Sequence, residues 1–202
     1  MIRVIASAAA LVAIVGVAAA WYFTQGSDDQ FAQCSSGSIA GGDIGGPFTL
    51  VNQEGETVTD ADVITEPTII YFGYTFCPDV CPIDSARNAE AIDLLAEQGI
   101  SATPVFISVD PKRDTPEVVG DFAFYLHDKM IGLTGTPEQV KAASTAYRTY
   151  YKEQPGDEEF YLVDHSTFSY LVLPEHGFVD FFRRETTAEQ MAETVACVVD
   201  AV

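Results

Sequence analysis

The chain has 202 residues, of which 48% are hydrophobic, enough for one ordinary domain with a real core and a short extension. Its formal net charge of −20 excludes non-specific binding to nucleic acid, because such binding requires a basic surface. The same charge disfavours docking on anionic lipid headgroups, whereas it would steer a cationic protein surface toward the chain.

The chain begins with an apolar segment. Residues 4–23 carry no charged side chain, and as a helix they would span about 30 Å, the thickness of the hydrocarbon core of a bilayer. Arg3 precedes the segment and aromatic residues close it, so we predict a membrane anchor over residues 1–23 with the remaining chain on the outer, periplasmic face of the inner membrane. The alternative is a cleaved signal peptide, since residues 18–20 are all alanine. Both alternatives place the domain where thiols can oxidise.

The residues after the apolar segment divide into a linker and a domain. Residues 24–46 are rich in glycine, serine and aspartate, which predicts a linker. Residues 47–202 are expected to form one domain, because the sequence contains no internal repeat and no sign of a second domain. The first expected elements are a hairpin over residues 48–51 and 57–59 and a buried strand over residues 68–75.

A helix is expected after this strand, followed by a second buried strand over residues 105–109. Gly99 is the expected C-terminal stop of the helix. The buried face of this helix is expected to hold Ala89, Ile92, Leu95 and Ala96.

Two Thr-Pro-Glu motifs, at residues 115–117 and 136–138, predict two further helix starts, with threonine as N-cap and proline in the first turn. The second of these helices is expected to reach about Tyr151. A polar, acidic loop is expected over residues 152–159.

The C-terminal part is expected to form a hairpin over residues 168–173 and 178–182 and a last helix opened by a capping box at residues 186–189. The apolar stripe of this helix is expected to hold Met191, Val195, Val198 and Val202. Strand-helix-strand units followed by a hairpin and a closing helix predict an α/β sandwich with a mixed central sheet.

Two cysteines lie directly after the first buried strand, in the sequence Cys77-Pro78-Asp79-Val80-Cys81-Pro82. If this stretch starts the helix, both thiols lie on one face, close enough to form a disulfide or to chelate one metal ion. A helix N-terminus also lowers the pKa of a thiol, and both chemistries require the thiolate. The alternative is a pair of structural cysteines or a permanent disulfide.

Thiolates combined with an imidazole suit copper or zinc, so the three histidines are candidates for a further ligand. His127 is expected at a helix end, and His176 is expected to be exposed in a hairpin turn. His165 directly precedes a strand, where a scaffold can position a ligand. The residues alone leave open whether His165 binds metal or is a hydrogen-bonded structural residue.

Three segments of the chain closely resemble the Sco/SenC family of copper proteins for cytochrome c oxidase assembly, and the similarity runs from about Gly45 to the C-terminus. The segments are Gly73-Tyr74-Thr75-Phe76-Cys77-Pro78-Asp79-Val80-Cys81-Pro82, Ile107-Ser108-Val109-Asp110-Pro111-Lys112-Arg113-Asp114-Thr115 and Tyr161-Leu162-Val163-Asp164-His165-Ser166. The resemblance implies a thioredoxin-like fold, copper as Cu(I) or Cu(II) bound by Cys77, Cys81 and His165, and the copper-bearing subunit of cytochrome c oxidase as partner.

Two functions are consistent with this resemblance. The first is a copper metallochaperone, a binding protein that takes copper from an upstream donor and helps assemble the dinuclear copper site of the oxidase. The second is a thiol-disulfide reductase that keeps the copper-ligand cysteines of the oxidase reduced, with Cys77 and Cys81 as the redox-active pair. No proline lies between Phe160 and Leu173 to supply the cis-proline usual in thioredoxin-like oxidoreductases, which favours metal binding.

Some residues near these motifs have simpler interpretations. Asp79 is expected to cap the helix. Asp164 either orients His165 or belongs to a plain turn. Cys34 and Cys197 do not belong to the shared site that the resemblance implies, and in an oxidising compartment we expect them to pair in a disulfide that ties the linker to the domain.

Overall fold

The computed structural model describes residues 30–34, 44–157 and 160–202. The predicted membrane anchor and most of the predicted linker lie outside these ranges. Within the described ranges, no helix combines the length and the apolar character needed to cross a bilayer.

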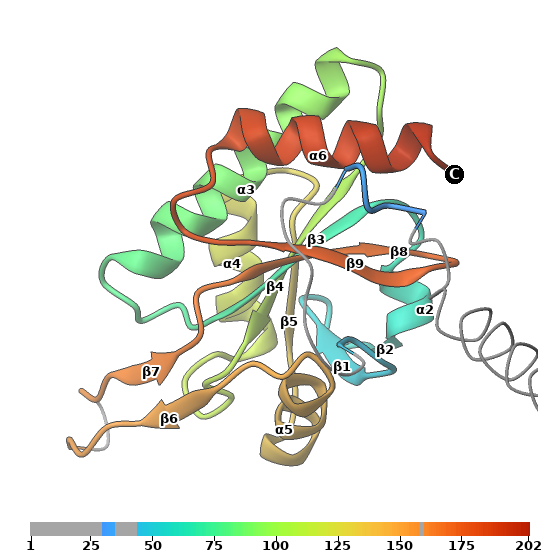
Figure 1. The fold of residues 1–202 in the computed structure, drawn as a ribbon. Helices are drawn as coiled ribbons and strands as arrows, with labels where there is room; N and C mark the ends of the chain where they lie inside the picture. Colours follow the sequence, from blue (N-terminus) through green and yellow to red (C-terminus); the bar gives the residue numbers. More distant parts are fainter. Residues whose placement is uncertain (1–29, 35–43, 158–159) are drawn as a thin grey trace, which may run out of the picture. The chain divides into compact units, whose positions relative to one another are not determined.

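Seven strands form one sheet with the spatial order β2-β1-β5-β4-β3-β8-β9 (Figure 1). The strands of this sheet are β1 (Thr49–Asn52), β2 (Thr57–Thr59), β3 (Thr68–Gly73), β4 (Thr103–Ser108), β5 (Ile131–Thr134), β8 (Ser169–Leu173) and β9 (Gly177–Phe182). Two further strands pair only with each other, and we call them the β6–β7 ribbon: β6 (Tyr151–Glu153) and β7 (Val163–His165). The helices are α2 (Asp60–Val63), α3 (Val80–Glu97), α4 (Pro116–Leu126), α5 (Pro137–Ala146) and α6 (Ala188–Asp200).

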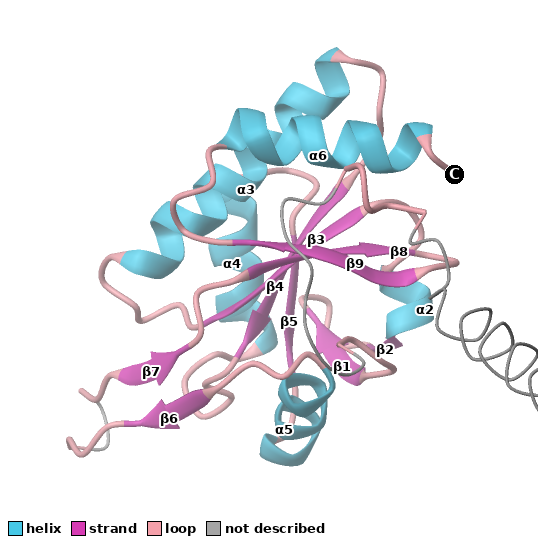
Figure 2. Cartoon of the chain, viewed as in Figure 1, coloured by secondary structure: helices cyan, strands magenta, loops and turns pink. Residues whose placement is uncertain are grey.

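The sheet is mixed, as predicted. Strands β3, β4 and β5 run parallel to one another, whereas β1 and β8 run antiparallel to their neighbours on either side. Every residue of β3 is buried, in keeping with its apolar and β-branched sequence at the centre of the sheet. Helix α3 follows β3 and packs against α6 (Figure 2).

The predicted helix starts are confirmed for α4 and α5, where Thr115 and Thr136 accept hydrogen bonds from backbone N–H groups of the first turn. Gly99 ends α3 with φ of 79°, as predicted. The capping box of α6 is shifted by one residue from the prediction, because Thr187 caps the helix and Gln190 reaches back to it.

Three predicted features at helix ends are wrong. Ala96 and Val202 are exposed; Ala96 lies in the last turn of α3 and Val202 lies beyond the end of α6. The helix expected to reach Tyr151 ends at Ala146, since Arg148 adopts the left-handed conformation, with φ of 51°, and turns the chain into β6.

Strand β5, of only four residues, was not predicted.

The predicted disulfide is present. Cys34 and Cys197 are bonded, with their Cα atoms 5.5 Å apart. Cys197 lies on the last helix, away from its apolar stripe, as expected. The bond therefore ties the segment before the domain to the C-terminal helix, and it leaves Cys77 and Cys81 as the free cysteines of the described chain.

Candidate metal centre

The two free cysteines lie on either side of the start of α3. The helix begins at Val80, so only Cys81 is helical and Cys77 lies in the preceding turn, where its N–H donates to the Tyr74 carbonyl at 3.2 Å. The condition for two thiols on one helix face is therefore not met, since the chain still turns at Pro78 and Asp79. Both side chains are nevertheless buried, Cys77 to 6% exposure and Cys81 to 0%.

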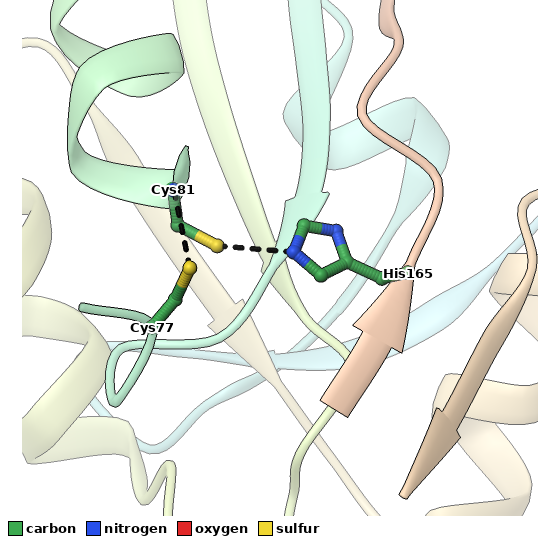
Figure 3. A group of neighbouring side chains, drawn as sticks. All are labelled: Cys77, Cys81 and His165. Carbon is green, nitrogen blue, oxygen red and sulfur yellow. Dashed lines mark hydrogen bonds between the residues drawn. The ribbon is translucent and has the colours of Figure 1, made fainter. Parts of the chain in front are cut away.

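The Cys77 sulfur caps α3. It accepts a hydrogen bond from the backbone N–H of Cys81 at 3.3 Å, one of the N–H groups in the first turn that have no partner within the helix (Figure 3). Asp79 occupies the N-cap position, but its exposed side chain makes no capping hydrogen bond. The capping role predicted for Asp79 thus falls to Cys77, whose anionic form is favoured there by the helix dipole.

His165 ends β7 and directs its imidazole at the cysteines. Its Nδ1 lies 2.9 Å from the Ser166 carbonyl oxygen, which can only accept, so Nδ1 carries a hydrogen. In the neutral ring Nε2 then has a free lone pair, and it lies 3.3 Å from the Cys81 sulfur (Figure 3). Asp164 does not orient the ring, because its carboxylate accepts from the Gln154 amide at 2.6 Å instead.

Two aromatic rings hold the imidazole edge-on. The ring centroids of Tyr71 and Tyr74 lie 6.1 and 5.7 Å from that of His165, with interplanar angles of 88° and 90°. Both tyrosines come from β3 or the residue after it, so the strand that leads to the cysteines also supports the histidine. Nothing in the residue types alone indicated this role.

The two thiols have opposite electrostatic environments. Hydrogen bonding from the Cys81 thiol, aided by the Cys81 and Asp79 backbone N–H groups and opposed by burial, lowers the pKa of Cys77 to about 4. Burial, followed by the hydrogen bond to Cys77, raises the pKa of Cys81. At neutral pH the reduced site therefore holds one thiolate and one thiol, and binding a metal through both sulfurs must release the Cys81 proton.

The three side chains fit a metal ion. The sulfurs of Cys77 and Cys81 and a ring nitrogen of His165 all lie within 4.8 Å of one another. Bond lengths of ~2.0–2.3 Å keep two ligands of one ion within ~4.6 Å, so small side-chain rotations would complete the coordination. Two sulfurs and an imidazole are soft to intermediate donors of the kind that copper and zinc prefer.

The other histidines do not join this group. His127 caps the C-terminus of α4, as predicted, and its Nε2 lies 3.2 Å from an Asp93 carboxylate oxygen. His176 is exposed in the β8–β9 turn, as predicted. Of the three, the structure brings only His165 to the cysteines.

The turn of residues 110–114, which belongs to the second resembling segment, borders the site. Asp114 is fully buried and accepts hydrogen bonds from the backbone N–H of Thr75 at 3.0 Å and from the Thr75 and Ser108 hydroxyls. It thereby fixes the segment that leads into Cys77. Among the described residues no peptide bond is cis, so no cis-proline faces the cysteine pair.

Comparison with known proteins agrees with this geometry. The family model described as SCO1/SenC matches residues 36–200. Protein SenC of Rhodobacter capsulatus is 55% identical over 200 residues, which are 98% of this chain and 90% of the relative. The human mitochondrial SCO1 homolog is 40% identical over 156 residues, 76% of this chain and 52% of the relative, so the chain matches about half the length of that longer protein.

Solved structures show the same fold. Copper-bound ScoI of Arabidopsis thaliana has a TM-score of 0.74 at 42% identity, covering 78% of this chain and 99% of that one. Copper-bound yeast Sco1 also has a TM-score of 0.74, at 35% identity, covering 80% of this chain and 91% of that one. The predicted thioredoxin-like fold with a mixed central sheet is confirmed. The matched segment includes the whole cysteine-histidine site, and the chain belongs to the SCO1/SenC family.

Proposed function

We propose that the chain is a copper metallochaperone that binds one copper ion through Cys77, Cys81 and His165 and helps assemble the dinuclear copper site of cytochrome c oxidase. The observation that carries this proposal is the convergence of two buried sulfurs and an imidazole nitrogen within 4.8 Å. Copper-bound relatives of the same fold support copper as the metal.

Copper is the cargo in this proposal, and the site is suited to releasing it. Structural metal sites are usually closed by four protein ligands, whereas three ligands leave a position for an incoming group. A partner thiolate or imidazole can take that position, after which the ligands of this chain are exchanged one at a time. His165 is only partly buried and lies on a small ribbon, so it is the ligand that an approaching partner can displace first.

The second candidate function is that of a thiol-disulfide reductase, and the low pKa of Cys77 favours it. The Cys77 thiolate would attack a disulfide of the partner to form a mixed disulfide. Cys81 would then attack Cys77, which releases two reduced thiols on the partner and leaves a Cys77–Cys81 disulfide on this chain. The absence of a cis-peptide bond among the described residues distinguishes the site from those thioredoxin-like oxidoreductases that have a cis-proline.

A histidine variant separates the two functions. His165→Ala removes a metal ligand but neither thiol, so the metallochaperone proposal expects loss of copper affinity with disulfide exchange largely preserved. Cys77→Ser, the control, should abolish both. If His165→Ala leaves copper affinity unchanged, the three-ligand proposal is wrong.

We also propose that residues 1–23 anchor the chain in the inner membrane, with the domain on the periplasmic face, where it meets the copper-bearing oxidase subunit and an upstream copper donor. The uncharged run of residues 4–23 supports the anchor. The Cys34–Cys197 disulfide supports an oxidising compartment. Protease treatment of intact spheroplasts should digest the domain, and full protection from protease would contradict this location.

A further inference from the structure

The histidine of the site lies on a separate structural unit from the cysteines. Cys77 and Cys81 follow the central strand β3, whereas His165 ends the β6–β7 ribbon, whose strands pair with each other and not with the seven-stranded sheet. A two-stranded ribbon is marginally stable alone, so side-chain contacts must set its position. The distance between the imidazole and the sulfurs therefore depends on what holds the ribbon against the domain.

Arg113 makes several of these contacts. Its guanidinium carbon lies 3.6 Å from the ring centroid of Tyr161, the residue that leads into β7. Its Nε donates to the Asp110 carboxylate at 2.6 Å, and the other oxygen of that carboxylate accepts from the Tyr161 hydroxyl, also at 2.6 Å. Arg113, Asp110 and Tyr161 thus form a closed triangle of one stacking contact and two hydrogen bonds.

The same guanidinium also lies near the cysteine loop. Its guanidinium carbon lies 4.8 Å from the ring centroid of Phe76, which directly precedes Cys77, and 5.7 Å from that of Tyr74, the ring that packs edge-on against His165. The next residue, Asp114, holds the backbone of Thr75. One short turn after β4 therefore contacts both segments that carry the candidate ligands.

We propose that Arg113 is a positioning residue that clamps the β6–β7 ribbon to the cysteine loop and so sets the placement of His165 relative to the two sulfurs. The expected effect of Arg113 on copper affinity rests on the proposed function. The expected effect on the position of His165 in the metal-free protein does not rest on it.

The chemistry of arginine suits this role. A planar guanidinium can stack between two aromatic rings while its edge donates to a carboxylate, which the compact ammonium of lysine cannot do. The Arg113 side chain is only 12% exposed and its Asp110 partner 3%, so the pair is little screened by water. Arg113→Lys should therefore retain part of the charge pairing but lose the stacking, and it should behave as an intermediate between the wild type and Arg113→Met.

The first test uses the reduced, metal-free full-length chain in detergent, with its histidine rings isotopically labelled for NMR. The chain contains only three histidines, so His127 and His176 serve as internal references. Arg113→Met should shift or broaden the His165 ring signals and leave the other two unchanged. Unchanged His165 signals would overturn the proposal, whatever the chain does with copper.

Arg87 supplies a matched control. It is also paired with an aspartate three residues away, Asp84, and the two side chains are 12% and 2% exposed, almost the same as in the Arg113 pair. Its other hydrogen bonds reach Asn88, Ser169 and the carbonyls after β9, and none of these partners belongs to the ribbon. Asp84 also accepts a hydrogen bond from the hydroxyl of Tyr71, whose ring contacts His165, so Arg87→Met should lower the stability of the domain and move the His165 signals less than Arg113→Met does.

The second test is a double-mutant cycle on copper affinity. Substitutions of groups that orient metal ligands typically weaken binding about 10- to 100-fold, and we expect a loss in this range for Arg113→Met. If Arg113 acts through His165, adding Arg113→Met to His165→Ala should cause no further loss. Full additivity of the two losses would overturn the proposal. Absence of copper binding by the wild type would instead refute the proposed function, and the NMR test would still decide the role of Arg113.

Discussion

Gly73 is the residue at which a single methyl group should disturb the site most directly. It ends β3, and a Cβ atom placed on it would lie 2.9 Å from the Cys81 sulfur, 2.9 Å from Tyr71 Cε1 and 3.0 Å from Phe106 Cε2. Carbon atoms in cores pack at about 3.5–4.0 Å, so all three contacts are too short by ~0.5 Å or more. The two rings and the Cys81 side chain are all buried, so the added methyl group must displace at least one of them.

Gly73→Ala should therefore destabilise the reduced, metal-free domain by about 3 kcal/mol, the upper end of the usual cost of overpacking. For a domain of this size that loss corresponds to a fall in Tm of about 6–12 °C. Displacement of the Cys81 sulfur should also disturb its 3.3 Å contact with His165 Nε2 and weaken copper binding. Chemical denaturation and copper titration measure the two effects.

Gly132→Ala is the control for this prediction. A Cβ atom on Gly132 would lie 2.5 Å from the Val119 carbonyl oxygen, on α4 and away from the cysteines, so this variant should lose stability but keep its copper affinity. If the free energy of unfolding of Gly73→Ala lies within about 0.5 kcal/mol of the wild-type value and the variant binds copper equally well, the packing argument is refuted.

Two further predictions concern the cysteines. The pKa of Cys77 is about 4 in the folded chain, whereas the ordinary value, which applies to the unfolded chain, is 9.0. The thiolate should therefore stabilise the fold fully above pH 9, and this stabilisation should be lost as the pH falls toward 4. Denaturation of Cys77→Ser and wild type across this range should show that pH dependence only in the wild type; equal pH dependence would contradict the assignment. The Cys34–Cys197 disulfide joins residues 163 apart, and the loop-closure relation gives it about 5 kcal/mol. Replacing both cysteines with serine should lower the free energy of unfolding by an amount that approaches this value and should leave copper affinity unchanged. A loss below about 1 kcal/mol would contradict the loop-closure argument.

Much of the fold could be predicted because local signals and burial agree. Strand β3 is apolar along its whole length, and the threonines that cap α4 and α5 stand directly before proline. The β6–β7 ribbon could not be predicted in this way. Tyr151 pairs with His165 across a polar loop, and the helix before it ends because Arg148 turns left-handed, a conformation that an arginine gives no reason to expect.

The site was predictable to different degrees. The spacing of Cys77 and Cys81 indicated a thiol pair, but the role of His165 came from the family resemblance and not from its residue type. The groups that orient the ligands left no signal, because the Ser166 carbonyl that fixes the imidazole is a backbone atom. The capping of α3 by a sulfur instead of Asp79 likewise depends on how the turn folds.

The central claim is that two thiolates and one imidazole bind a single copper ion. It is tested most directly by titrating the reduced chain with Cu(I) and Cu(II) without oxygen, in parallel with His165→Ala, and recording absorption spectra. We predict one copper per chain and, with Cu(II), a sulfur-to-copper charge-transfer band that His165→Ala abolishes. Absence of stoichiometric copper binding, with rapid disulfide exchange intact, would contradict the metallochaperone proposal and make the chain a reductase.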